Sequence, residues 1–401
     1  MSLLDAHVAI AKESTFGTPV TTGTGLLIDP KDWSLEPAWE NVPSMVRLPG
    51  QETPTTSFSR SFMGMKGAGS GEILDKTQGI LLELMFGSLT SAVSPLDAAL
   101  NRFTLIPSAT GKYGKSATLQ LFKPYVDTTG EAETTDGVKV VGFTLSCDIG
   151  GNLRYGVTLD GRDYVTSGRV VTSATTNGSA NVTVASTVGI AVGMTVVGTG
   201  IPASTVVRSI TSATVFTLGD AAGAAVLATV TNATAALTIT RGTAIAKAVP
   251  TYASNAQPYA WNGVSVLTLD GQAAACTGFE LSWQSGIKTD RHFLGAAPKL
   301  EQIADGSLST ATLTLKGMEF LATNRQRDRF NSLTSATSLA AFAVTLKTAT
   351  PSVNGAKSEF TITIPTAQAS SGPPDMRGGQ PASFNILNSM TALYDTIDAA
   401  P

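Results

Sequence analysis

The sequence is poor in the residues that carry most enzyme chemistry. Of its 401 residues, 2 are Cys and 2 are His, while 14% are charged and 6% are aromatic. Cys147 and Cys276 are too few for a disulfide framework or a Cys-rich zinc site, and we expect them to pack as small apolar residues within strands. With 27 Lys and Arg against 30 Asp and Glu, the formal net charge of -3 argues against a protein that grips nucleic acid, because phosphate binding needs clustered cations.

Long apolar runs and secretion signals are also missing. No run of about 18 or more apolar, uncharged residues stands outside the Ala/Thr/Gly-rich middle of the chain. The first residues, MSLLDAHVAIAKEST, lack the cationic and apolar regions of a secretory signal. We therefore expect a soluble protein that is made in the cytoplasm and does not associate with membranes.

The candidate reactive groups match no catalytic motif. His7 and His292 lie far apart in the sequence, without a Cys or carboxylate at metal-ligand spacing and without a G-x-S-x-G elbow. The string Gly111–Ser116 (GKYGKS) ends like a phosphate loop but lacks the first glycine, so we interpret it as a turn before a strand. Arg325, Arg327 and Arg329 have the acidic residues Asp328 and Glu319 nearby, which is typical of a solvated helix face or of a face that forms salt bridges between subunits. The sequence predicts no enzyme, no metal and no cofactor.

Most of the chain has the pattern of short strands. Segments that alternate apolar with small polar residues, as half-buried strands do, are Ser116–Phe122, Val138–Cys147, Val264–Leu269, Leu308–Leu315 and Phe360–Ile364. We predict a mainly β fold of sandwiches or barrels, with two amphipathic helices over Ile73–Phe86 and Met318–Leu333. Gly64–Gly71 (GMKGAGSG) is interpreted as a turn before the first helix.

The middle of the chain differs in composition from both flanks. From Thr166 to Thr240 the charged residues are Arg169, Arg208 and Asp220, and the rest is dominated by Val, Thr, Ala, Ser and Gly. Because β-branched residues favour pleated surfaces, we predict a small inserted β domain over residues 166–245. A flexible low-complexity linker is the alternative.

The flanks have the same order of elements, which predicts an internal duplication. Ser61–Ser91 and Leu308–Ser338 each run from a strand to a helix to a Ser/Thr-rich turn, and Ser-Leu-Thr-Ser occurs at 88–91 and at 332–335. Each flank also has a long polar segment before its helix, Asn41–Ser59 and Gln284–Gly306. We therefore predict three domains, over residues 1–165, 166–245 and 246–401.

Several strings, in order along the chain, resemble landmarks of tail tube proteins, also called major tail proteins, of long non-contractile-tailed bacteriophages. They are Ala9–Val20 (AIAKESTFGTPV), Val46–Gly50 (VRLPG), Gly79–Ser88 (GILLELMFGS), Gly114–Leu121 (GKSATLQL), Gly142–Gly151 (GFTLSCDIGG) and Met390–Pro401 (MTALYDTIDAAP). The ordered set covers most of the chain outside the middle segment, which many relatives lack.

The resemblance implies a β-sandwich or partly closed barrel flanked by one helix, present here twice in tandem. It implies rings of three chains with pseudo-sixfold symmetry, or of six chains, that stack into the virion's tail tube. The resemblance also implies that DNA passes through the lumen without specific binding. The implied protein partners are other copies, the tape measure protein, and the tail terminator and distal tail proteins. The inserted domain is expected on the tube exterior.

The long polar segments are candidates for loops that reach the next subunit or ring. We expect Arg47, Leu48 and Phe58 to make such inter-subunit contacts. Two other functions remain open from the sequence: a phage capsid or decoration protein, and a cell-surface adhesin-like β protein, although the latter should carry a secretion signal. An esterase-like enzyme is the least favoured alternative.

Overall fold

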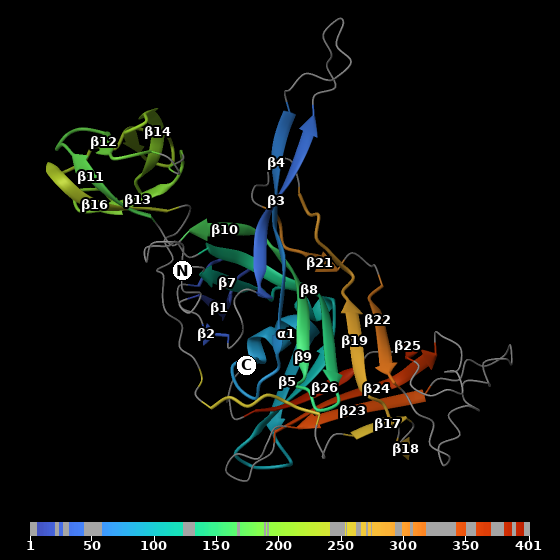
Figure 1. Ribbon diagram of the computed structural model, residues 1–401. Coiled ribbons are helices and arrows are strands. Elements are labelled where there is room, and N and C mark those ends of the chain that lie inside the picture. Colours follow the sequence, from blue (N-terminus) through green and yellow to red (C-terminus); the bar gives the residue numbers. More distant parts are fainter. Residues whose placement is uncertain are drawn as a thin grey trace, which may run out of the picture.

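The computed structural model of the chain describes residues 6–20, 24–26, 32–43, 58–122, 133–166, 169–187, 190, 192–240, 253, 255–261, 266–269, 272–273, 275–292, 299–304, 308–317, 342–349, 358–369, 381–386 and 390–396. Strands make up most of these residues (Figure 1), which confirms the expectation of a mainly β fold. The predicted helix Met318–Leu333, with Arg325, Arg327 and Arg329, lies outside the described residues.

Within these described ranges, eighteen strands are joined by hydrogen bonds into one sheet, and six others close into a separate barrel. The sheet strands that precede the barrel in sequence are β1 (His7–Lys12), β2 (Thr24–Gly25), β3 (Ser34–Pro43), β4 (Phe58–Glu72), β5 (Gly87–Val93), β6 (Asn101–Pro107), β7 (Ala117–Phe122), β8 (Glu133–Asp148), β9 (Arg154–Gly161) and β10 (Asp163–Thr166). Those that follow it are β17 (Val266–Leu269), β18 (Gln272–Ala273), β19 (Gly278–Gln284), β22 (Thr310–Lys316), β23 (Phe342–Ala349), β24 (Glu359–Ala369), β25 (Ala382–Ile386) and β26 (Thr391–Thr396). A separate two-stranded sheet pairs β20 (Ile287–Lys288) with β21 (Ile303–Ala304).

The sheet contains the same order of strand pairing twice. In the first strand set, β2 pairs with β1, β1 with β7, β7 with β8, β8 with both β9 and β10, β9 with β4, and β4 with β3. The second strand set has the same pairing order. It consists of β18, β17, β23, β24, β25, β26, β22 and β19, which correspond in turn to β2, β1, β7, β8, β9, β10, β4 and β3. All of these pairings are antiparallel.

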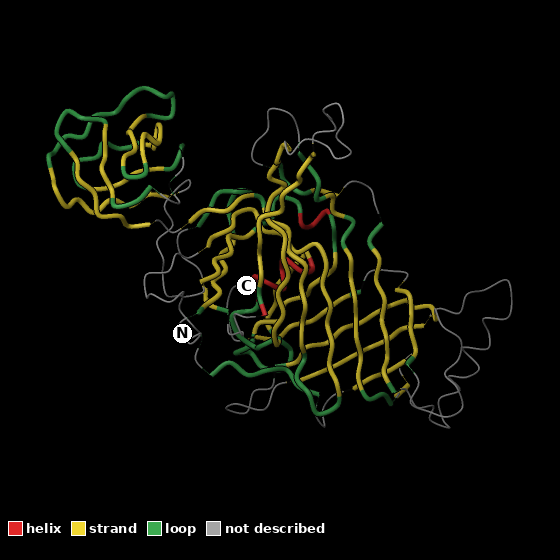
Figure 2. The backbone as a smooth tube through the Cα atoms, turned by 45° about the horizontal axis from the view of Figure 1, so that its top comes forward, coloured by secondary structure: helices red, strands yellow, loops and turns green. Residues whose placement is uncertain are grey.

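Among the described strands, the pairing of β19 with β8 joins the two sets into one sheet, and β26 of the second set also pairs with β6 of the β5–β6 hairpin. Strands β8, β9, β19 and β22 run roughly across β23 and β24, so the sheet folds over into two layers (Figures 1 and 2). A single hydrophobic core contains side chains from both sets, including Phe143, Leu281, Leu313, Phe360 and Tyr394.

The described helix, α1 (Gly79–Phe86), is shorter than the predicted Ile73–Phe86. Its C-terminal end agrees with the prediction, because Gly87 caps it with a left-handed φ of 89°. The start was wrong because the first apolar residues pair with other segments. Ile73 donates its amide to Leu153 O, and Leu74 forms a β-bridge with Pro258. A short 3-10 helix, η3 (Thr110–Lys112), precedes β7, as expected for a turn before a strand.

The glycine-rich string 64–71 is part of strand β4 and not the turn that the sequence analysis expected. Close approach of neighbouring groups explains the glycines. A Cβ on Gly67 would lie 1.9 Å from Ser34 O, and a Cβ on Gly69 would lie 2.5 Å from the ring of Trp33. The glycines therefore let β3 and the Trp33 ring pack directly on the backbone of β4.

The barrel lies within the predicted segment 166–245. It consists of β11 (Arg169–Thr175), β12 (Asn181–Val184), β13 (Thr195–Gly198), β14 (Val206–Ser212), β15 (Val215–Gly219) and β16 (Asn232–Thr240), closed in the order β11–β12–β15–β14–β13–β16. It has its own hydrophobic core, which includes Val182, Val207, Phe216 and Leu237. The hydrogen-bonded strands of this barrel contradict the alternative prediction of a flexible low-complexity linker.

Candidate functional site

The contact between β8 and β19 is the main joint between the two strand sets. The two strands pair without interruption from Gly278 opposite Asp148 to Gln284 opposite Gly142. On the core side, Leu281 lies opposite Leu145, and Trp283 lies opposite Phe143 with their rings stacked at 6.5 Å. Because both the backbone and the core continue across this joint, the two strand sets are held side by side as neighbours in one sheet.

A second contact holds β26 against β6. Arg102 forms a two-pronged ion pair with Asp395, with Nε and Nη2 at 2.8 and 2.7 Å from the carboxylate oxygens. The Asp395 side chain is fully buried. Tyr259 donates its hydroxyl to Asp395 O, and Tyr394 donates its hydroxyl to Leu74 O. Such a desolvated, bidentate pair fixes the register of the two strands.

Charged residues from the segment after β20 are buried against the first strand set. Lys299 lies 2.5 Å from Asp160, and Gln302 donates its side-chain amide to the same carboxylate at 2.6 Å. Glu301 lies 2.5 Å from Lys139, whose side chain is almost fully buried. These paired charges lock the connection between β19 and β22 onto β8 and β9, because breaking one pair would leave the other charge buried alone.

The GKYGKS string contributes to this cluster. The amide of Gly114 donates to Glu301 Oε1 at 2.6 Å, so the string binds a carboxylate of the same chain. Lys112 is 3% exposed, and its ammonium donates to Val140 O at 2.9 Å. Burial, with a smaller contribution from the nearby Lys139 charge, lowers the pKa of Lys112 to about 7.

The sheet face opposite the core is polar and lined mostly by small side chains. Along β8, β9, β19, β22 and the second half of β4, residues that face the core alternate with small residues that face away from it. Those facing away include Ala68 and the hydroxyl residues Ser70, Thr144, Ser146, Thr158, Ser282, Thr312 and Thr314. Its carboxylates include Glu36 and Glu280, both exposed, and Asp148, which pairs with Lys316 at 3.1 Å. Two exposed cations lie on the same face, Lys66 opposite Glu36 and Arg154 on β9. We call this surface the polar face.

A depression of about 340 Å³ lies on the polar face, at a place where glycines leave the strands without side chains. Its lining includes Gly69, Gly156, Thr144, Thr158 and Gln284, with Asp32 as its carboxylate. A Cβ on Gly156 would lie 2.8 Å from Thr144 Oγ1, which shows how closely the strands are packed beneath it. Hydroxyl and amide groups therefore form most of the polar lining.

The string AIAKESTFGTPV holds the first strand set together. Glu13 is 3% exposed, and its carboxylate accepts hydrogen bonds from the hydroxyls of Ser116 and Thr118 and from the amides of Gly17 and Gly137, at 2.6 to 2.9 Å. Arg162 donates to Gly17 O at 2.6 Å and lies over the ring of Phe16. Glu13 thus joins separate backbone segments of the first strand set through its carboxylate.

The predicted contact residues are only partly described. Arg47 and Leu48 lie outside the described residues, and Phe58 is the first residue of β4, opposite Pro43. Figure 1 shows β3 and β4 extending together beyond the other strands, so Phe58 lies on a hairpin that projects from the sheet. Whether these residues make inter-subunit contacts stays a prediction.

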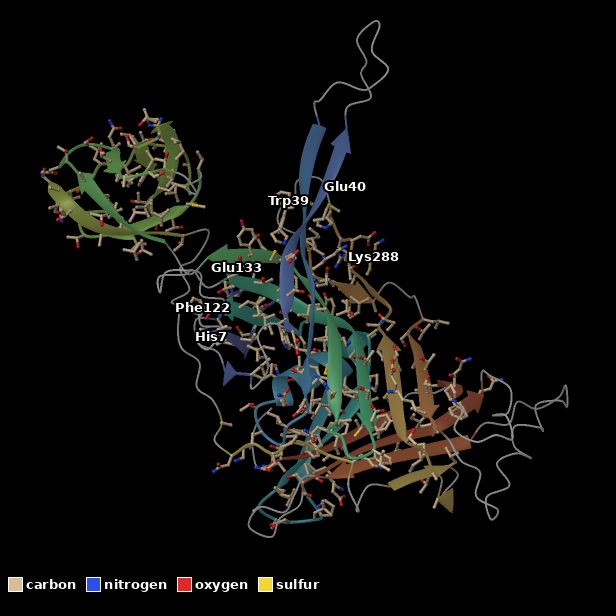
Figure 3. The ribbon with its side chains drawn as sticks, viewed as in Figure 1. His7, Trp39, Glu40, Phe122, Glu133 and Lys288 are labelled. Carbon is tan, nitrogen blue, oxygen red and sulfur yellow. The ribbon has the colours of Figure 1, made fainter. Side chains whose placement is uncertain are left out.

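The histidines and cysteines have separate surroundings. His7 is buried against Phe122, with ring centroids 5.1 Å apart (Figure 3), while burial lowers the pKa of His292 beside Lys299. Cys147 is buried in β8 as predicted, and burial raises its pKa to about 11. Cys276 packs against the core just before β19 and not within a strand. Among the described residues, no group of three potential ligands that could hold a metal ion occurs.

Two pairs of matching residues at equivalent places in the two strand sets were not predicted from the sequence. Leu35–Asn41 (LEPAWEN) on β3 and Phe279–Ser285 (FELSWQS), which covers most of β19 and the residue after it, share a Glu and a Trp at the same spacing. The matched residues are Glu36 with Glu280 and Trp39 with Trp283. This short similarity was present in the sequence, but only the pairing order shows that the two strands correspond.

No protein-family model matches the chain, and no curated protein is significantly similar to it. Within the described ranges, no helix is long and apolar enough to span a membrane.

Proposed function

We propose that this chain is a tail tube protein of a long non-contractile-tailed bacteriophage, a structural virion protein that polymerises into stacked rings. The observation that carries the proposal is the β8–β19 joint, where two strand sets with the same pairing order share one sheet edge to edge. In this proposal the two sets are tandem tail-tube-type domains, over residues 1–165 and 246–401, separated by the inserted domain 166–245.

The same joint repeated between chains would close a ring. Within one chain, β8 of the first set pairs with β19 of the second. In the second set β24 holds the place of β8, and in the first set β3 holds the place of β19. A head-to-tail contact of this kind forms a closed ring when its rotation closes. Three chains with two sets each would give a pseudo-sixfold ring, with every sheet edge paired.

The polar face suits the wall of a DNA conduit. Most side chains there are small, and Glu36 and Glu280 occupy matching positions on the corresponding strands β3 and β19. In a ring of three chains these residues would place six carboxylates around the lumen. Negative charge repels the phosphate backbone, so the genome would pass without being held.

The remaining parts have assigned roles in the same proposal. The connection containing Arg47 and Leu48, with Phe58 at its end, would contact a neighbouring subunit or ring. The barrel would decorate the exterior, because a module of its size in the lumen would obstruct the bore. The tape measure, tail terminator and distal tail proteins would be the partners inside and at the ends of the tube. The chain would be made in the cytoplasm of the host bacterium.

Electron microscopy of the purified full-length chain in negative stain tests this proposal. We expect stacked rings with a uniform central bore. Closed shells would favour the capsid or decoration function instead, and isolated particles at all concentrations would contradict self-assembly.

A further inference from the structure

Two tryptophans hold matching places in the two strand sets but differ in exposure. Trp39 lies on β3 and Trp283 lies on β19, within the matching segments LEPAWEN and FELSWQS. Trp283 is 7% exposed, whereas Trp39 is 41% exposed. The fraction exposed therefore differs about sixfold between two residues of the same type on corresponding strands.

The β8–β19 joint explains the burial of Trp283. Its register partner on β8 is Phe143, and the two rings are stacked with an interplanar angle of 15°. Phe143 in turn contacts Phe86 of helix α1, at 4.9 Å between ring centroids. The core of the first strand set thus covers Trp283 of the second.

On the β4 side, Trp39 packs against aromatic residues of its own chain. Its register partner on β4 is Phe62, whose ring it meets edge-on at 5.3 Å, and Phe62 contacts Tyr164 at 6.4 Å. Within the described strands, the ladder of β3 has β4 as its partner, and the place that β8 occupies beside β19 is not filled by a strand of the same chain. Figure 3 shows Trp39 on β3 at the base of the projecting hairpin.

We propose that Trp39 anchors the contact between β3 of one chain and the second strand set of a second copy. The inference rests on the proposed ring and names its contact residue. The occupant follows from the continuity of the sheet. The strand that covers Trp283 is β8, and the strand with the same pairing order in the second set is β24. The second copy would therefore cover Trp39 as the first strand set covers Trp283.

A tryptophan at this place is suited to such a role. Large aromatic side chains bury much apolar area with few rotatable bonds, and they dominate many interfaces once neighbouring contacts exclude water. Phe62 and Tyr164 support the ring from the chain's own side. The contact needs no charge pairing, because the corresponding joint at Trp283 is formed by apolar and aromatic side chains.

Site-specific photocrosslinking tests which residues of a neighbouring chain contact position 39. The full-length chain would carry p-benzoylphenylalanine in place of Trp39, and the crosslinked peptides would be identified by mass spectrometry. We expect crosslinks between chains that map to residues 359–386. Crosslinks to the barrel, or the absence of crosslinks between chains at micromolar concentration, would overturn the inference.

Variants at the same position test whether the contact carries assembly. Trp39→Ser should raise the concentration needed for ring formation more than about tenfold. Trp39→Phe, which keeps an aromatic ring, should form rings at a concentration close to that of the unmodified chain. Val93→Ser, at a residue that is 65% exposed on β5, serves as the matched control and should assemble normally. Melting temperatures of all three variants establish that they are folded.

The outcomes separate this inference from the proposed function. If the unmodified chain forms rings while Trp39→Ser assembles like Val93→Ser, the tube proposal stands and Trp39 is not the anchor. If the unmodified chain forms no rings at any concentration, both are wrong.

Discussion

The hydrogen bonds of Glu13 explain why a carboxylate lies buried within the string Ala9–Val20. Its carboxylate gathers two hydroxyls and two amides from separate parts of the first strand set. The sequence suggested the string as a landmark, but it could not show which atoms Glu13 binds, because Ser116, Thr118 and Gly137 are more than 100 residues away. The contacts favour a stabilising role for this string.

Replacing Glu13 should therefore destabilise the fold. Glu13→Gln keeps the shape but removes the charge and one acceptor oxygen, and we expect the free energy of unfolding to fall by about 2–3 kcal/mol. Chemical denaturation of the unassembled chain measures this loss. Glu280→Gln, at an exposed carboxylate, should stay within about 0.5 kcal/mol of the unmodified chain. Equal stability of the two variants would contradict the role of Glu13.

Lys112 should make stability depend on pH. Its pKa is about 7 in the folded chain and 10.5 is its ordinary value, so between these values the unfolded chain binds the proton that the folded chain does not. Stability therefore rises with pH across this range. The cost of burying the charged Lys112 ammonium is full below about pH 7 and has disappeared above about pH 10.5.

Lys112→Met should remove this dependence. We expect the variant to be more stable than the unmodified chain by on the order of 2 kcal/mol at pH 6, with the difference shrinking as the pH rises to 10. Denaturation of both proteins at several pH values measures the difference. A difference that does not change with pH would contradict the assignment.

At the scale of elements, the sequence predicted the strands best where apolar and polar residues alternate. The predicted Ser116–Phe122 and Val138–Cys147 correspond to β7 and the second half of β8. The pattern failed in β4, because its glycines have no side chains with which to show a period of two. It also placed the start of α1 too early, because Ile73 and Leu74 are apolar for β pairing and not for helix packing.

The glycines of β4 give a prediction at this scale. Gly69→Ala should destabilise the chain by about 1–3 kcal/mol, because the new Cβ would lie 2.5 Å from the Trp33 ring. Ser70→Ala, at the next residue of the same strand, is the control and should cost less than about 1 kcal/mol. Thermal unfolding of the two variants compares them. A neutral Gly69→Ala would show that the ring is free to move aside.

At the scale of the whole molecule, the joint between strand sets could not be predicted from sequence. The similarity of β3 and β19 is limited to two identical residues in seven, and what covers Trp283 comes from β8, about 140 residues earlier. Composition did predict a β segment in the middle, because Val and Thr alternate there with few charges. The predicted boundaries at 165 and 245 remain predictions.

The charge of the polar face gives a prediction for the assembled tube. Glu36→Lys with Glu280→Lys should leave assembly intact, since both side chains are exposed, and should increase retention of short duplex DNA by tubes about tenfold or more at low salt. Co-sedimentation measures the retained DNA. Asp220→Lys, on the barrel, controls for added charge elsewhere. Equal retention by both variants would show that the polar face does not line the bore.

The central claim is that copies of this chain join side by side around a hole. Averaged end-on views of the purified chain in cryo-electron microscopy test it most directly. We predict a ring of three chains with six similar sheet segments around an open centre. An average that shows a single compact subunit, or a filled particle without a bore, would contradict the claim.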